Sequence, residues 1–239
     1  MLMKGQVALE YLIIFTVILL AIVPLTFIAT SNTELTRSTS EVSAALGTIS
    51  AAADSIYALG PGSQTTIQTF IPKSYDFHQS SFNSKEVVMG VFINNEFQEP
   101  FKLGKANIRG NMPVGPNVQY VSMKMTDKGY VLINDAKVIN SPGYFSVVAN
   151  QSSSGIKGVT VTNIHTASLD LKTNYSGPGW ITLSNNALGN MAAGANLTMN
   201  VTYNVPANAN KTTYLSYIQI LDTNTNAEYA WIPFRVRVT

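Results

Sequence analysis

The chain opens with a long apolar stretch that passes into an amphipathic one. No Asp, Glu, Lys or Arg occurs between Tyr11 and Thr33, and a helix of that length, rising about 1.5 Å per residue, can cross a bilayer. Polar residues take over at Ser31, yet apolar residues recur at helical spacing along one face: Leu35, Val42, Leu46, Ile49, Ala53 and Ile56. The pattern predicts one helix of roughly 50 residues, not a secretory signal with an apolar core of about 7–15.

One proline and one breaker shape this predicted helix. Pro24 has no amide donor and its ring clashes with the preceding turn, so we expect a kink there. The helical pattern ends at Gly60-Pro61-Gly62, because these residues break helices.

Short strand patterns separated by Gly, Pro and Asn turns fill the rest of the chain. They include "EVVMGVFIN" (86–94), "VQYVSMKM" (118–125), "GYVLIND" (129–135) and "NLTMNVTYNV" (196–205). Ser152-Ser153-Ser154-Gly155 interrupts the pattern like a linker, so we expect two β modules, residues 61–151 and 155–239. The predicted fold class is α+β: a long N-terminal hydrophobic and amphipathic α-helix, followed by an antiparallel, immunoglobulin-like β-sandwich head.

Alternation gives finer expectations for the last strands. Along 196–205 the apolar residues fall on one face and the Asn and Thr residues on the other. Residues 214–238 predict a terminal hairpin in which Arg235 and Arg237 face solvent. Trp180 and Trp231 are expected to fill the sandwich core, not to stack on a sugar.

Composition and motifs argue against catalysis and nucleic-acid binding. Of 239 residues only 12% are charged, and the formal net charge of +2 is too small for a nucleic-acid surface. Cysteine is absent, which excludes disulfides and thiolate metal sites. His78 and His165 are isolated, and the sequence has no P-loop, nucleophile elbow or HExxH motif. We therefore expect no enzyme activity, no cofactor and no metal.

One segment has a partial likeness to a calcium loop. Asp222, Asn224 and Asn226 match its first odd positions, but Ala227 and Pro233 replace the required glycine and glutamate. A hairpin turn explains these residues better.

Five Asn-X-Ser/Thr sequons lie in the C-terminal part of the chain, at Asn150, Asn174, Asn196, Asn200 and Asn210. Composition alone predicts roughly four by chance, so their position matters more than their number. Asn196 and Asn200 fall on the predicted outward face of one strand, where an oligosaccharyltransferase could attach a glycan.

The start of the chain carries a specific signal. The stretch "KGQVALEYL", Lys4 to Leu12, resembles the processing and assembly signal of archaeal type IV pilin precursors: a basic residue and Gly, then Gln, and four positions later Glu. The resemblance implies a leader of residues 1–5, which a prepilin peptidase removes between Gly5 and Gln6, and a pilin helix of residues 6–60. It also identifies "YALGPGS" followed by "IQTFIP" as the transition from this helix to the first strand of the head.

The resemblance further implies partners and a location. The helix would hold the precursor in the membrane with its N-terminus in the cytoplasm, as Lys4 also favours. A pilus assembly platform and its ATPase would then build a filament of identical subunits with these helices in its core. The charge of Glu10 would be compensated by the terminal amine of a neighbouring subunit, which fixes the register between subunits. The mature chain would be a structural subunit of an adhesion pilus at the cell surface.

Two other functions stay open. The chain could be a minor or tip pilin whose extra β module binds a surface, a carbohydrate or another cell. It could also be a membrane-anchored extracellular binding protein with the same leader, which predicts a deep ligand pocket in the head. An archaellum subunit fits the "QVALEYL" start less well.

Overall fold

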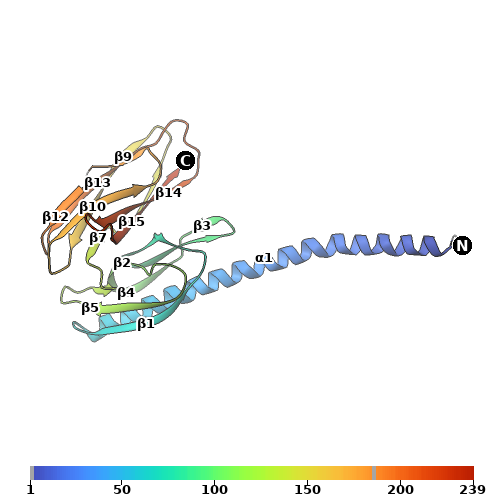
Figure 1. The fold of residues 1–239 in the computed structure, drawn as a ribbon, viewed down its shortest axis with the longest axis horizontal. Coiled ribbons are helices and arrows are strands. Elements are labelled where there is room, and N and C mark those ends of the chain that lie inside the picture. Colours follow the sequence, from blue (N-terminus) through green and yellow to red (C-terminus); the bar gives the residue numbers. More distant parts are fainter. Residues whose placement is uncertain (1–2, 185–186) are drawn as a thin grey trace. The chain divides into compact units, whose positions relative to one another are not determined.

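The computed structural model describes residues 3–184 and 187–239, with side chains for all of these except residues 3–10, 31, 32, 34 and 35. Helix α1 (Met3–Leu59) is continuous through Pro24 and ends immediately before Gly60 (Figure 1). The chain divides into two compact units, Met1–Glu41 and Val42–Thr239, so that α1 contributes to both. The predicted long helix is confirmed; whether it bends at Pro24 stays a prediction.

The second half of α1 is a core helix of the compact unit Val42–Thr239. Five residues of the predicted apolar stripe are each at most 3% exposed: Val42, Leu46, Ile49, Ala53 and Ile56. The sixth, Leu35, lies outside the described side chains. The helix ends where Gly60 takes a φ of 87°, a left-handed conformation that glycine adopts without a steric penalty.

The strands that follow α1 form one six-stranded sheet. They are β1 (Gln64–Ile71), β2 (Tyr75–Ile93), β3 (Glu96–Gln98), β4 (Phe101–Gly110), β5 (Asn117–Met125) and β6 (Val131–Ile133), in the spatial order β1-β5-β6-β4-β2-β3. All neighbouring pairs are antiparallel except β4 and β6. The strands predicted at 86–94, 118–125 and 129–135 lie within or overlap β2, β5 and β6.

The helix is tied to this sheet at β4. Asp54 accepts hydrogen bonds through Oδ1 from the amides of Lys105 at 2.7 Å and Ala106 at 2.8 Å. A Cβ at Gly104 would lie 3.0 Å from both the Asp54 carboxylate and the Ser50 hydroxyl. Glycine at this position therefore lets α1 and β4 approach closely.

The last nine strands form a sandwich of two sheets. One sheet has the order β12 (Ala187–Met191), β10 (Leu169–Ser176), β14 (Thr213–Asp222), β15 (Glu228–Val238) and β8 (Phe145–Ala149); the other has β11 (Ile181–Leu183), β13 (Asn196–Asn204), β9 (Ser154–Asn163) and β7 (Val138–Ser141). Between β7 and β8 the chain passes from one sheet to the other, and β8 then pairs in parallel with β15. Val161, Leu171, Met199, Ile218 and Phe234 are fully buried in its core. The α+β class with an immunoglobulin-like sandwich is confirmed.

The predicted linker at Ser152-Ser153-Ser154-Gly155 lies inside this sandwich. Ser154 begins β9, while β7 and β8, which precede it, pair with β9 and β15. By strand pairing the change from sheet to sandwich falls between Ile133 and Val138, so the expected boundary between residues 151 and 155 is wrong. The small polar residues there form the β8–β9 turn, in which the Ser153 hydroxyl donates to the Asn150 carbonyl at 2.6 Å.

The terminal hairpin is present, but one prediction about its outer face is wrong. Phe234 and Val236 point into the sandwich core, and Arg235 and Arg237 lie on the opposite face, as alternation requires. Arg237 is exposed, whereas Arg235 is only 1% exposed. The difference arises because β2 covers part of this face. The alternation predicted along 196–205 is confirmed in β13.

Candidate functional site

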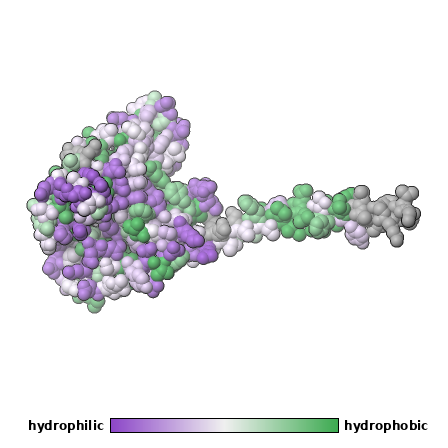
Figure 2. Space-filling view, viewed as in Figure 1, coloured by the Kyte–Doolittle hydropathy of each residue, from purple (hydrophilic) through white to green (hydrophobic). Residues whose placement is uncertain are grey.

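The segment Tyr11–Thr30 of α1 presents an uncharged and mostly apolar surface on all sides. Each residue from Tyr11 to Thr30 is exposed, including Leu20 at 73% and Phe27 at 74%. Figure 2 shows this stretch of the helix in mostly hydrophobic colours. By length and composition two stretches of α1 could cross a membrane, Tyr11–Thr30 and Thr36–Leu59, and 39% of an 18-residue window in the second is buried inside the protein. The segment Tyr11–Thr30 is therefore the one that needs an apolar environment from outside its own unit.

Threonine hydroxyls in this segment are satisfied by the helix itself. Thr16 donates to the Leu12 carbonyl at 2.7 Å, Thr26 to the Val23 carbonyl at 2.9 Å, and Thr30 to the Thr26 carbonyl at 2.9 Å. Such bonds to the preceding turn remove the cost of placing a hydroxyl in an apolar medium. The segment thus reaches residue 30 without a charged group or an unpaired hydroxyl among these threonines.

The predicted processing and assembly residues lie at the start of this helix. Gly5, Gln6 and Glu10 belong to α1, but their side chains lie outside the described residues. Cleavage between Gly5 and Gln6 and the pairing of Glu10 therefore stay predictions. Pro24 lies within the exposed apolar segment.

Arg235 joins the six-stranded sheet to the sandwich. Its guanidinium forms an ion pair with Glu99 and donates hydrogen bonds to the carbonyl and the side-chain oxygen of Gln79. The Arg235 Cζ atom also lies 5.3 Å from the ring centroids of both Phe97 and Tyr144. Burial lowers the pKa of Arg235 to about 10. The group therefore keeps its charge at neutral pH, and its partners compensate that charge.

Further contacts join the same two parts. Trp231 donates through Nε1 to the Ser80 carbonyl at 2.9 Å, and Gln79 donates through Nε2 to the Ser216 carbonyl at 3.1 Å. The His78 ring stacks on Tyr217 with centroids 4.0 Å apart. Trp231 therefore packs between sheet and sandwich and not in the sandwich core, which corrects the prediction for this residue. The predicted core role holds better for Trp180, which is partly buried against the sandwich core.

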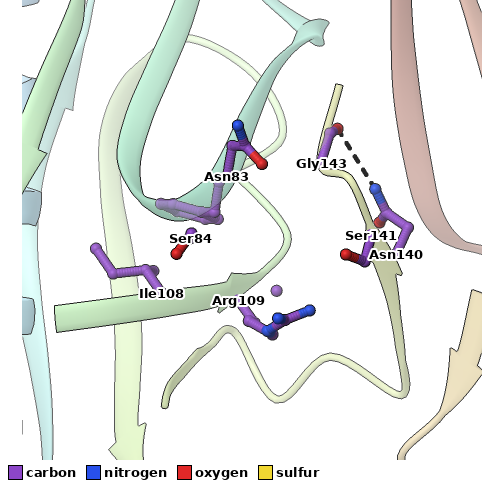
Figure 3. A pocket seen from close by; sticks show the side chains of 9 residues that line it. Asn83, Ser84, Ile108, Arg109, Asn140, Ser141 and Gly143 are labelled. Carbon is purple, nitrogen blue, oxygen red and sulfur yellow. Dashed lines mark hydrogen bonds between the residues drawn. The ribbon is translucent and has the colours of Figure 1, made fainter. Parts of the chain in front are cut away.

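A small polar cavity lies at this junction (Figure 3). Its volume is about 50 Å³, and its lining includes Asn83 and Ser84 of β2, Arg109 of β4, and Asn140 and Gly143 of the β7–β8 segment. The Asn140 side-chain amide donates across the β7–β8 turn to the Gly143 carbonyl at 3.4 Å. Such a volume holds a few water molecules, on the order of 10–15 Å³ for each, and no organic substrate.

The five predicted sequon asparagines are all exposed. Asn196 and Asn200 lie on the same face of β13, and Asn196 accepts a hydrogen bond from Thr162 at 2.6 Å. Asn174 lies on β10, in the other sheet of the sandwich, and its side chain donates to Gln219 of the neighbouring strand β14 at 2.9 Å. The remaining two, Asn150 and Asn210, lie outside the strands, in connecting segments. Exposure allows glycosylation at each site, and its occurrence stays a prediction.

The Asp222 segment closes the β14–β15 hairpin. Asp222 accepts hydrogen bonds through Oδ1 from the amides of Asn224 at 3.0 Å and Thr225 at 2.8 Å. These bonds lower the pKa of the Asp222 carboxyl. The carboxylate is therefore used in a turn, as the hairpin interpretation predicted. Among the described residues no group of three or more His, Asp or Glu side chains could hold a metal ion.

No protein-family model and no curated protein matches the sequence. A family 123 glycoside hydrolase from Clostridium perfringens is similar in structure, with a TM-score of 0.36 and 10% identity over 41% of this chain and 23% of that chain. A PapD-like domain of human CEP192 gives a TM-score of 0.36 and 7% identity over 44% and 86%. The SrpA adhesin from Streptococcus sanguinis gives 0.31 and 16% identity over 39% and 52%.

The chain thus spans about a quarter of the length of the hydrolase and about half of the adhesin. At TM-scores this low the matches carry no conclusion about function.

Proposed function

We propose that the chain is the precursor of a structural subunit of an archaeal type IV adhesion pilus. One observation carries the proposal: the exposed, uncharged segment Tyr11–Thr30 continues without a break into a helix that is the core of a folded head. Leaving a large apolar side chain in water instead of burying it costs about 1.5–3 kcal/mol. A segment that is apolar on all sides fits both a bilayer before assembly and a bundle of identical helices afterwards.

The start of the chain supplies the chemistry for this change of environment. A prepilin peptidase would cut between Gly5 and Gln6, so that the membrane segment stays on the mature chain. Cleavage creates an α-ammonium on Gln6, four positions before Glu10. Opposite charges about 4 Å apart attract by about 4 kcal/mol at an effective dielectric constant of 20. Glu10 would therefore favour one axial register between neighbouring subunits, without any catalytic role.

The exposed sequons and the polar outer surface of the sandwich suit a location outside the cell. The proposal gives the chain no catalytic activity and no cofactor. Its partners are other copies of itself, the prepilin peptidase, the assembly platform with its ATPase, the membrane before assembly and an oligosaccharyltransferase.

Substitution of Glu10 tests the proposal. Glu10→Ala should leave leader removal intact, because the cut lies four residues before it, and should abolish or strongly reduce surface filaments. Leader removal is measured by the mass of the N-terminal peptide, and filaments by the amount of subunit sheared from cells. Glu96→Ala, which removes an exposed carboxylate of β3, is the matched control and should assemble normally. Processed Glu10→Ala protein in filaments of normal yield would refute the registration role.

Measuring the chain in both the sheared filament fraction and the membrane fraction also distinguishes the two other functions. A minor or tip pilin would be processed but scarce in the filament fraction. A membrane-anchored binding protein would stay in the membrane fraction.

A further inference from the structure

The outer face of the β1–β5 ladder combines an exposed aromatic ring with unpaired polar groups. In the register of these strands Gln68 lies opposite Tyr120, and Thr66 lies opposite Ser122. Tyr120 is 70% exposed. The side-chain amides of Gln64 and Gln68 make no hydrogen bond to any other residue that the structure describes. Donors, acceptors and an aromatic surface are therefore all directed to the outside.

A groove lies further along the same two strands. It has a volume of about 310 Å³, and its lining includes Gln64, Thr66, Ser122, Lys124 and Asp135. This volume is at the lower end of the roughly 300–1,000 Å³ of ligand sites. Tyr120 is two residues from Ser122 on the same face of β5, which places it about 7 Å further along the strand.

Asp135 is held beside the groove by its neighbour Asn134. The Asn134 amide donates to the Ser122 carbonyl at 2.9 Å, and its side-chain oxygen accepts from the Ser122 amide at 3.2 Å. The Asn134 side-chain amide also donates to the Asn111 carbonyl at 3.1 Å. These bonds fix the loop to β5. The exposed Asp135 carboxylate forms no ion pair with another described residue, so it is free to accept hydrogen bonds from a ligand.

The chemistry of this face fits a sugar. Sugar hydroxyls both donate and accept hydrogen bonds, so they can pair with the carboxamide, hydroxyl and carboxylate groups of this face. The apolar face of a pyranose ring can pack on an exposed tyrosine. Lys124 and Asp135 balance each other, so the groove carries no net charge that would select a polyanion. β1 is an edge strand, so the sheet places no further strand beside it. We propose that this face, the β1–β5 groove, binds a neutral glycan chain.

This activity belongs to the folded head and does not depend on whether the chain polymerises. The test uses the full chain in a detergent without a sugar headgroup, with cellohexaose, maltohexaose, chitohexaose and mannohexaose as probes. Binding is followed by saturation-transfer NMR and calorimetry. At least one hexasaccharide should bind, and both Tyr120→Ala and Asp135→Asn should weaken that binding at least about tenfold. Tyr57→Ala is the matched control, because Tyr57 is also an exposed tyrosine, at 41%, but lies on α1.

Two results would overturn the proposal. One is that none of the four probes binds at about 10 mM, where even weak specific complexes form. The other is that a probe binds equally to wild type, Tyr120→Ala and Asp135→Asn. Self-association that Tyr120→Ala abolishes, with no probe bound, would assign the face to contacts with a second copy and would also overturn it. Filament yield of Tyr120→Ala is measured separately, since it reports on the proposed function and not on the groove.

Discussion

Arg235 places a full charge in the interior of the protein. Among the described residues it is the largest of the fully buried side chains, and its partners Glu99 and Gln79 come from the other part of the head. A buried charge without partners is strongly destabilising. The pair therefore favours one arrangement of sheet and sandwich over others that would leave the guanidinium unpaired.

Removing this side chain should loosen the junction. Arg235→Ala is expected to lower the free energy of unfolding by about 2–3 kcal/mol, because Gln79 loses its donor and a large side chain leaves a gap. Denaturant unfolding of the full chain in detergent measures the change. The control is Arg237→Ala, an exposed arginine two positions along the same strand, which should stay within about 0.5 kcal/mol. Equal effects of the two substitutions would show that the buried ion pair contributes nothing specific.

Tyr175 makes the stability of the head depend on pH in the alkaline range. Burial raises its pKa to about 12, and its hydroxyl donates to the Pro178 carbonyl at 3.2 Å. In the unfolded chain a tyrosine loses its proton near pH 10. The stabilisation of the folded state by the neutral Tyr175 hydroxyl is therefore complete below about pH 10 and is lost as the pH rises towards about 12. We expect the fall in Tm between about pH 9 and 11 to be smaller in Tyr175→Phe than in wild type. Tyr120→Phe, at an exposed tyrosine, should behave as wild type; the same reduced fall there would contradict the assignment to Tyr175.

For single residues, the sequence predicted the face of a strand on which a side chain lies better than it predicted whether that side chain is buried. Alternation placed Arg235 and Arg237 correctly on the face away from the sandwich core. It could not predict that β2, far away in the sequence, covers Arg235 and leaves Arg237 in solvent. The same long-range packing draws Trp231 out of the expected core and to the carbonyl of Ser80. The β1–β5 groove could not be predicted from the sequence either, because strand register brings Thr66 of β1 beside Ser122 of β5.

At the scale of elements, α1 is one helix with two kinds of surface. From Tyr11 to Thr30 it is uncharged and exposed on all sides, and from Val42 it buries a single stripe in the head. A change from a uniform apolar surface to a stripe marks a helix that leaves one environment for another. Both patterns were predictable from the sequence, because the first depends on local composition and the second on helical periodicity.

Asp54 should be the main polar tie between α1 and the six-stranded sheet. Asp54→Ala leaves the amides of Lys105 and Ala106 without their acceptor, so unfolding should become easier by about 2 kcal/mol. Asp54→Asn keeps an acceptor oxygen and should cost less. Amide hydrogen exchange at Lys105 and Ala106 gives a local readout and should accelerate in Asp54→Ala. Unchanged exchange at both amides would contradict the role given to this carboxylate.

The boundary between the β modules could not be predicted from local composition. The run Ser152-Ser153-Ser154 looks like a linker but forms a turn between two strands of the same sandwich. β7 and β8 belong to that sandwich only through pairing with β9 and β15, and β15 begins near the end of the chain. Pairing over such a distance leaves no local signal.

At the scale of the whole molecule, buried polar contacts hold the head together, and α1 extends from the head with the exposed, uncharged segment Tyr11–Thr30. In the proposed function, filament assembly would provide an apolar environment for this segment, and the leader signal around Gly5, Gln6 and Glu10 would provide the means to reach it. The head would then carry the outward functions, which include the proposed glycan binding in the β1–β5 groove.

The mass of the N-terminal peptide from surface filaments sheared off native cells tests the central claim most directly. We expect a terminus at Gln6, free or cyclised, in an abundant filament band. An intact Met1 terminus, or a processed chain found only in the membrane fraction, would contradict the role of structural pilus subunit.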